Sequence, residues 1–162
     1  MKYLSAVACL MLTMMTLETE IGAIEPAPVP LFEVIDFEGR SVQSDQLPLQ
    51  GKALLIYVQP HCPPCDALLN RFKKDSGADL SQKMILVVGG TEKEAKALAG
   101  RFPDLAQAGW YVDPLKNAYL QLKLQGAPVV LGVHNGVIAW SVDGALSPSK
   151  TLHSLFTTWF EK

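Results

Sequence analysis

Apolar residues gather in short continuous runs, a pattern that predicts buried strands. Residues 53–58 (ALLIYV) lie between Gly51 and Pro60, and residues 84–88 (MILVV) form a second run. Runs of this length without a polar interruption suit strands that are covered on both faces of a sheet. Shorter runs at residues 110–112, 129–133 and 137–142 predict three further strands.

Turn residues predict two hairpins. Asn135-Gly136 separates the last two apolar runs, and this dipeptide is a strong signal for a tight hairpin. Near the other end, residues 32–37 alternate weakly, Gly39-Arg40 follows, and Val42 resumes the apolar pattern. We therefore expect one hairpin early in the chain and one late.

Helical periodicity fills the gaps between the central strands. Residues 65–74 carry apolar side chains at helical spacing, and this pattern ends before Gly77. Thr91 and Glu94 form a capping box that opens a helix over residues 91–101. The buried faces are expected to contain Leu68, Leu69 and Phe72 in the first helix and Ala95, Leu98 and Phe102 in the second.

Two more helices are predicted towards the C-terminus. Asp113 is a candidate N-cap and Pro114 a first helical residue, ahead of apolar residues at i, i+3, i+4 and i+7. Ser147-Pro148 opens the last helix. The expected buried faces are Leu115, Ala118, Tyr119 and Leu122, then Leu152, Leu155, Phe156, Trp159 and Phe160.

The order of these elements predicts an α/β fold with a central mixed sheet flanked by helices. Crossovers through helices give parallel pairs, and the late hairpin adds an antiparallel pair. The simplest places for Trp110, Trp140 and Trp159 are the core or half-buried sheet positions. A chain of 162 residues suits one such domain.

Residues 1–23 have the layout of a secretory signal peptide. Lys2 precedes an uncharged stretch over residues 3–17, and small residues end the segment. The alternative is an uncleaved N-terminal membrane anchor. In either case we expect the remainder of the chain to face a non-cytoplasmic compartment, the periplasm. Residues 24–30, with three prolines, are expected to be an extended linker before a single domain over residues 31–162.

The net charge and the cysteine content narrow the range of possible functions. The net charge is −2 and no basic run exceeds Lys73-Lys74, which argues against nucleic acid as a partner. Removal of the signal would leave two cysteines, Cys62 and Cys65. A bridge between them would close too small a loop to stabilise a fold, so the pair points to chemistry.

The sequence Cys62-Pro63-Pro64-Cys65 lies between a predicted strand and a predicted helix. A cysteine at a helix N-terminus is stabilised as a thiolate, with a pKa of about 3.5–7.5 at such sites. Cys62 would then be the nucleophile in disulfide exchange, and Cys65 would resolve the mixed disulfide. Both prolines suit a first helical turn and stiffen this active-site loop.

A metal site is the alternative interpretation of the same pair. Copper(I) suits soft thiolates, and His61 or His134 could join Cys62 and Cys65 in a metallochaperone or other copper-binding module. A four-ligand zinc site lacks a second cysteine pair, and His153 is the one further histidine.

With its strand and helix order, and Gly126-Ala127-Pro128 before a later strand, this motif resembles the thioredoxin superfamily. The early hairpin and the extra helix at 91–101 are similar to its secreted TlpA/ResA-type branch. The resemblance covers residues 31–160. It implies a thioredoxin-like fold with an N-terminal hairpin extension, a cis bond between Ala127 and Pro128, and a substrate groove at these two residues.

This sequence departs from the family pattern in three ways. His61 replaces the usual tryptophan before the first cysteine, and Ile56 replaces the buried acid of thioredoxin. Glu92 is the candidate proton acceptor at the start of the inserted helix, or simply a residue that stabilises the helix dipole. A charged His61 beside Cys62 would make the dithiol more oxidising, and the negative charge of Asp66 would make it less so. The alternative is that His61 is an exposed loop residue with little electrostatic effect.

The resemblance implies a secreted thiol-disulfide oxidoreductase without a cofactor. It favours a reductant of specific envelope proteins such as apocytochromes, supplied with electrons by a membrane thiol relay. A dithiol oxidant or isomerase on the same fold is an alternative, as is an assembly factor whose cysteine pair has lost its function.

Overall fold

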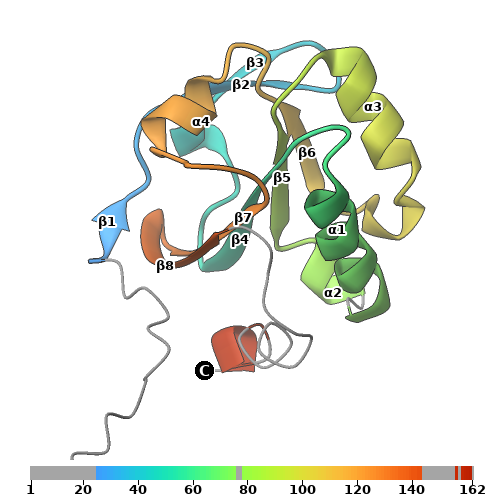
Figure 1. The fold of residues 1–162 in the computed structure, drawn as a ribbon. Helices are drawn as coiled ribbons and strands as arrows, with labels where there is room; N and C mark the ends of the chain where they lie inside the picture. Colours follow the sequence, from blue (N-terminus) through green and yellow to red (C-terminus); the bar gives the residue numbers. More distant parts are fainter. Residues whose placement is uncertain (1–24, 76–77, 144–155, 157, 162) are drawn as a thin grey trace, which may run out of the picture.

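A single eight-stranded sheet forms the centre of the computed structural model, which describes residues 25–75, 78–143, 156 and 158–161. The strand order is β1-β8-β7-β4-β5-β6-β2-β3 (Figure 1). The strands are β1 (Ala27–Pro28), β2 (Glu33–Asp36), β3 (Ser41–Gln43), β4 (Lys52–Val58), β5 (Met84–Val88), β6 (Gly109–Val112), β7 (Val129–His134) and β8 (Val137–Asp143).

The pairing confirms the mixed sheet. Strand β4 runs parallel to β5, and β5 runs parallel to β6, as their helical crossovers require. Strand β7 is antiparallel to both β4 and β8, and β2 is antiparallel to both β3 and β6. Both predicted hairpins are present, and Gly39 (φ +82°) and Gly136 (φ +76°) adopt the left-handed conformations that their turns need.

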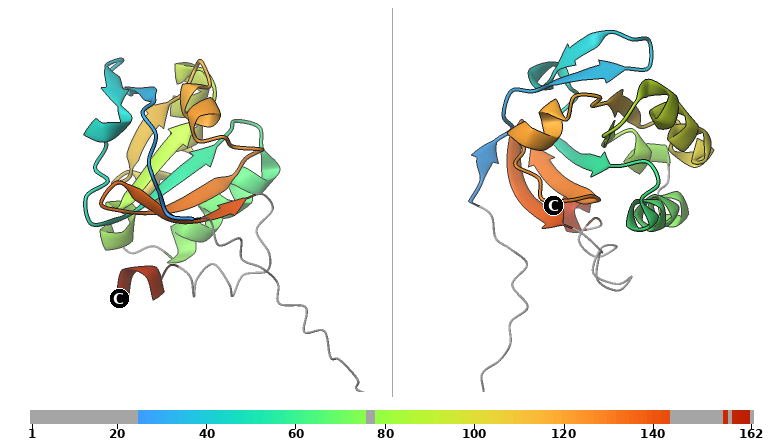
Figure 2. Two further views of the ribbon diagram at one scale, coloured as in Figure 1. Left: turned by 90° about the vertical axis from the view of Figure 1, so that its left-hand side faces the viewer. Right: turned by 45° about the horizontal axis from the view of Figure 1, so that its top comes forward.

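The helices lie on both sides of the sheet (Figure 2). They are α1 (Pro63–Asp75), α2 (Ala78–Ser81), α3 (Glu92–Gly100) and α4 (Asn117–Gln121), with 3₁₀ turns at Ser44–Gln46 and Pro103–Leu105. Alternate residues of β4 face opposite sides, so Ile56 packs towards α1 and α3 and Tyr57 packs towards α4. The site therefore stands on a strand that is buried on both faces.

The predicted helix faces of α1 and α3 are confirmed, with all six residues 3% exposed or less. The capping box is present, since Thr91 Oγ1 accepts from the backbone N–H of Glu94 and the Glu94 carboxylate accepts from the backbone N–H of Thr91. Phe102 lies just beyond the end of α3 but still enters the core.

The predicted start of α4 is wrong. This helix begins at Asn117, after Lys116 in a left-handed conformation (φ 56°), and Leu115 is 83% exposed instead of buried. Asp113 is the reason, because it is fully buried and its carboxylate accepts from the Tyr57 hydroxyl at 3.2 Å. The backbone N–H of Asp113 also donates to the carbonyl of Val88 in β5. Asp113 thus continues the sheet, and the chain must turn before the helix can begin. Asp113 still accepts from the backbone N–H of Asn117 at 2.6 Å.

Part of the expected linker joins the sheet. Within residues 24–30, strand β1 pairs with β8, and the backbone N–H of Val29 donates to the carbonyl of Gly136. Proline is tolerated here because β1 is an edge strand. The expected signal peptide at residues 1–23 lies outside the described residues. Within those residues, no helix has the length and apolar character needed to cross a membrane.

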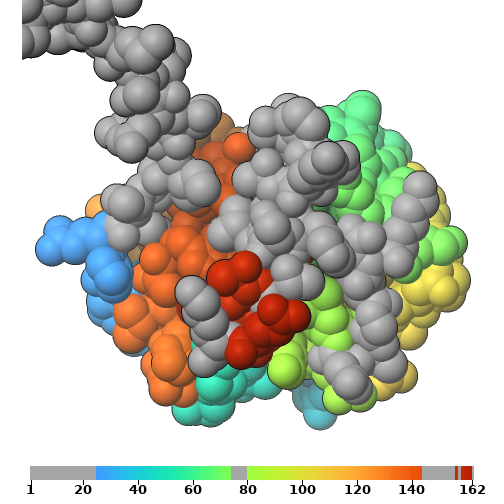
Figure 3. All heavy atoms as spheres, turned by 90° about the horizontal axis from the view of Figure 1, so that it is seen from below, coloured from blue at the N-terminus to red at the C-terminus, as the bar shows by residue number. Residues whose placement is uncertain are grey.

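The described end of the chain packs against the sheet. Figure 3 shows residues 156 and 158–161 in red beside the orange strands. The Phe156 ring centroid lies 5.0 Å from that of Phe72 and 6.3 Å from that of Trp140. Trp159 and Phe160 are partly buried against the same core, as predicted. Ser147, Pro148, Leu152 and Leu155 lie outside the described residues. The three tryptophans are half-buried, as expected.

Candidate functional site

The cysteine pair occupies the junction of β4 and α1. Cys62 directly precedes α1, Pro63 and Pro64 are its first two residues, and a disulfide joins Cys62 to Cys65. The carbonyl of Cys62 accepts the helical hydrogen bond from the backbone N–H of Asp66 at 3.0 Å. Proline has no backbone N–H. Its presence at these two positions costs no hydrogen bond, because the first N–H groups of a helix have no partner within it.

The two sulfurs lie in different surroundings. Cys65 is fully buried, whereas Cys62 is half-buried and can meet a second protein. The backbone N–H of Cys65 donates to Sγ of Cys62 at 3.3 Å. In the reduced protein this donor and the positive end of α1 would stabilise negative charge on Cys62. The arrangement therefore distinguishes an accessible sulfur from a protected one.

The start of β7 forms the other side of the site. The peptide bond between Ala127 and Pro128 is cis, as the resemblance implies. Tyr57 of β4 pairs with Val129 of β7, which brings this bond next to the loop that carries the cysteines. The carbonyl oxygen of Ala127 lies 3.7 Å from Sγ of Cys62. Pro128 is buried and Ala127 is half-buried, so a partner chain can reach Ala127 beside the sulfur.

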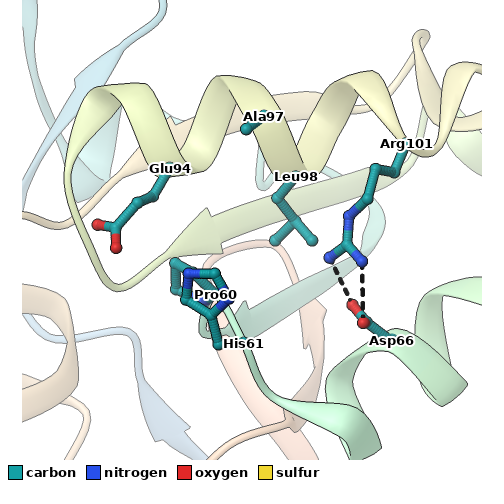
Figure 4. A pocket seen from close by; sticks show the side chains of 7 residues that line it. All are labelled: Pro60, His61, Asp66, Glu94, Ala97, Leu98 and Arg101. Carbon is teal, nitrogen blue, oxygen red and sulfur yellow. Dashed lines mark hydrogen bonds and ion pairs between the residues drawn. The ribbon is translucent and has the colours of Figure 1, made fainter.

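His61 lines a cavity of about 340 Å³ next to this loop (Figure 4). Its backbone is left-handed (φ 54°), which is uncommon for a residue with a side chain, and its ring is exposed. The other lining residues are Pro60, Asp66, Glu94, Ala97, Leu98 and Arg101. Asp66 of α1 and Arg101, just after α3, form a double hydrogen bond of 2.7 and 3.0 Å at one end of the cavity (Figure 4).

The acids near the start of α3 have different positions. Glu92 is exposed and forms an ion pair with Lys96 at 2.6 Å. Glu94, in contrast, lines the cavity with His61. Hydrogen bonds from the hydroxyl and then the backbone N–H of Thr91 hold the pKa of Glu94 below its usual value, and His61 adds a smaller effect. Ile56 is fully buried and offers no acidic group.

Local sequence patterns do not predict that Glu94 and Arg101 line this cavity. Glu94 was recognised as a helix cap, and nothing in the local pattern indicated that it would also face His61. Arg101 stands 35 residues from its partner Asp66, and no periodicity links two such positions. A charged residue at the end of a helix was the one signal available.

Of the two histidines suggested as copper ligands, His61 adjoins Cys62 in the chain, but His134 lies far from the cysteines. His134 pairs with Lys52 at the beginning of β4, whereas the cysteines follow the end of that strand. His134 and the cysteine pair thus lie at opposite ends of β4. Among the described residues, no three His, Cys, Asp or Glu side chains stand close enough to hold a metal ion.

No protein-family model matches this chain, and no curated protein does so either. Solved structures, in contrast, are similar to this chain. DsbF of Mycobacterium tuberculosis superposes with a TM-score of 0.62 at 17% identity, over 79% of this chain and 91% of that one. A secreted M. tuberculosis disulfide oxidoreductase homologous to E. coli DsbE gives a TM-score of 0.62 at 11% identity, over 79% and 92%.

A third similar structure comes from another organism. The thio-disulfide isomerase from Thermus thermophilus has a TM-score of 0.62 at 13% identity, over 85% of this chain and 98% of that one. At such identities the likeness concerns the fold. It confirms the expected thioredoxin-like fold, with a mixed sheet between helices and an additional hairpin at the N-terminal side.

Proposed function

We propose that this chain is a secreted thiol-disulfide oxidoreductase that reduces disulfides in specific proteins of the bacterial envelope. The observation that supports it best is the pair of sulfurs at the start of α1. Cys62 is partly exposed and accepts a hydrogen bond from the Cys65 backbone, and Cys65 is buried behind it. A reaction that passes through a mixed disulfide needs this asymmetry.

The reaction starts from the dithiol. The Cys62 thiolate attacks one sulfur of the client disulfide, which forms a mixed disulfide and releases the other client sulfur as a thiolate. Cys65 then loses its proton and attacks Sγ of Cys62. The products are the Cys62–Cys65 disulfide and a second client thiolate, so two electrons pass to the client. Each released thiolate takes up a proton from water.

The client chain would lie along Ala127 in an extended conformation. Ala127 is half-buried, and its carbonyl oxygen lies 3.7 Å from Sγ of Cys62. An extended peptide that pairs with this backbone would bring its own sulfur to Cys62, as in other cases of strand addition. In this proposal Ala127 and Pro128 shape the substrate groove, while His61, Pro63 and Pro64 form the loop beside it.

The proton of Cys65 needs an acceptor near a largely apolar site. Glu92 was the candidate, but its exposed ion pair with Lys96 gives it no described contact with the cysteines. Water entering beside Cys62 can fill this role without a dedicated residue. Glu92 remains a candidate, and its replacement by glutamine tests it through the pH profile of the second step.

Regeneration of the dithiol requires an electron donor. The compartment outside the cytoplasm is oxidising, so a reductant there needs electrons carried across the membrane by thiol groups. A membrane thiol relay is therefore the partner we propose. The expected signal peptide at residues 1–23, and a secreted protein among the similar structures, support this location.

Trapping of the intermediate tests the assigned roles. Reduced Cys65→Ser, mixed with an excess of insulin, should form an adduct that disappears when dithiothreitol is added. The matched Cys62→Ser variant should form little adduct, because its remaining sulfur is buried. Equal trapping by the two variants, or none by either, would contradict the proposal.

A further inference from the structure

The cavity beside the cysteine loop has the size and position of a site for one side chain. At about 340 Å³ it lies near the lower limit of small-ligand pockets, which is about 300 Å³. His61, one of its walls, directly precedes Cys62, and consecutive Cα atoms are only about 3.8 Å apart. A client residue near the reacting cysteine can therefore reach this cavity.

The walls of the cavity combine apolar and acidic character. Pro60, Ala97 and Leu98 supply apolar surface, and Glu94 stands at the end of the cavity where α3 begins (Figure 4). Hydrogen bonds from Thr91 lower the pKa of Glu94, so its carboxylate is charged at neutral pH. An occupant with an apolar stem and a positive end complements this surface.

The ion pair at the far end of the cavity adds no net charge to its walls. Asp66 already engages the Arg101 guanidinium through two hydrogen bonds, at 2.7 and 3.0 Å. The formal charges of Asp66 and Arg101 cancel, which leaves the Glu94 carboxylate as the wall group that attracts a cation and repels an anion. A wholly apolar occupant would remove water from that carboxylate without replacing its hydrogen bonds, at a cost in free energy.

One carboxylate oxygen of Glu94 is available to such an occupant. Both the hydroxyl and the backbone N–H of Thr91 donate to Oε2, at 2.7 and 2.9 Å. Within the part of the chain that the structure describes, Oε1 is left without a hydrogen-bond donor. The cap thus fixes the carboxylate in place and leaves an acceptor for a ligand.

We propose that this cavity binds a lysine or arginine side chain that lies within about three residues of the reacting cysteine of the client. This inference rests on the proposed function, since it assumes that Cys62 attacks a client disulfide. The aliphatic stem packs on Leu98 and its apolar neighbours, and the cationic end meets Oε1 of Glu94. The cavity thereby favours clients with a basic residue next to the disulfide.

The test uses synthetic peptides that each contain one internal disulfide. Lysine is placed at each of the three positions on either side of one cysteine, and a matching series has norleucine, which keeps the stem without the charge. The readout is the ratio of second-order reduction rates, lysine over norleucine, with reduced full-length protein. We expect a ratio of about three to five at the best position, typical of a partly exposed ion pair.

Glu94→Gln removes the charge and keeps the cap, because glutamine also completes a capping box. This variant should bring the ratio to about one, and Ala97→Phe should lower it by filling the cavity without a change of charge. Glu38→Gln, an equal change of charge at the exposed early hairpin, should retain the wild-type ratio. Raising the salt concentration should reduce the wild-type ratio, since ions screen the pair.

Failure of this inference is distinguishable from failure of the proposed function. Hydroxyethyl disulfide is small and uncharged, so its reduction by the wild type reports on the dithiol alone. If neither it nor any peptide is reduced, the proposed function is wrong. If all are reduced but the ratio is one at every position, or if Glu94→Gln keeps the preference, the basic side-chain site is overturned and the oxidoreductase stands.

Discussion

The backbone N–H of Cys65 donates to Sγ of Cys62 at 3.3 Å. The first turn of α1 thus holds the buried sulfur of Cys65 and also supplies a hydrogen-bond donor to the half-buried sulfur of Cys62. Pro63 and Pro64 fill the positions between them, where no N–H is needed. Because two residues separate the cysteines, the backbone N–H of Cys65 can reach Sγ of Cys62. This contact supports the different roles proposed for the two cysteines.

The first prediction concerns thiol reactivity. In the reduced protein, iodoacetamide should label Cys62 at least about ten times faster than Cys65, because Cys62 is half-buried, Cys65 is fully buried, and the Cys62 thiolate is stabilised. Mass spectrometry of brief labelling reactions measures the two rates. The difference should vanish in concentrated guanidinium chloride, and faster labelling of Cys65 in the native protein would reverse the assigned roles.

The second prediction is the reduction potential of the pair. A reductant supplied by a thiol relay should have a potential near or below about −270 mV, measured by equilibration with dithiothreitol. A value near about −120 mV would indicate a disulfide donor instead. In that case His61→Ala should lower the potential if a charged imidazole stabilises the Cys62 thiolate.

The third prediction concerns the ion pair between Asp66 and Arg101 at one end of the cavity (Figure 4). Asp66 and Arg101 are 31% and 52% exposed, so solvent weakens their attraction. A double-mutant cycle with Asp66→Ala and Arg101→Ala should give a coupling free energy of about 0.5–1 kcal/mol in urea unfolding. No measurable coupling would show that the pair does not help to hold α1 against α3.

The fourth prediction is a pH dependence of stability at the β2–β3 hairpin. Burial alone would raise the pKa of Asp36, but hydrogen bonds from the backbone and guanidinium of Arg40 and from the backbone of Glu38 hold it below its usual value. A depressed native pKa stabilises the fold above the unfolded pKa of about 3.9, and this stabilisation is lost as the pH falls through the native value.

Asp36→Asn should therefore lower the free energy of unfolding at pH 7. The difference in this free energy between the variant and the wild type should become smaller below about pH 4. Urea unfolding at pH 7, 5 and 3 provides the measurement. Asp45→Asn, at an exposed position of the neighbouring 3₁₀ turn, is the matched control. A difference that stays constant down to pH 3 would contradict the role of this carboxylate.

Several features of the protein follow from the sequence alone because their causes are local. The run over residues 53–58 forms a buried strand because its side chains are apolar, apart from the Tyr57 hydroxyl, which is hydrogen-bonded inside the fold. Thr91 and Glu94 cap α3 because they are three residues apart, and Asn135-Gly136 closes a hairpin for the same short-range reason. The spacing of Cys62 and Cys65 likewise determines that the second sulfur lies one turn from the first.

Other features depended on which distant segments meet, and only the tertiary structure decided them. The burial of Asp113 against Tyr57 delays α4, although the local pattern fits an earlier start. The register of β4 with β7 brings Ala127 to Cys62, 65 residues earlier in the chain. The packing of α3 beside α1 turns a helix cap, Glu94, into a wall of the cavity. Such contacts depend on sheet register and helix packing, which periodicity along one segment does not encode.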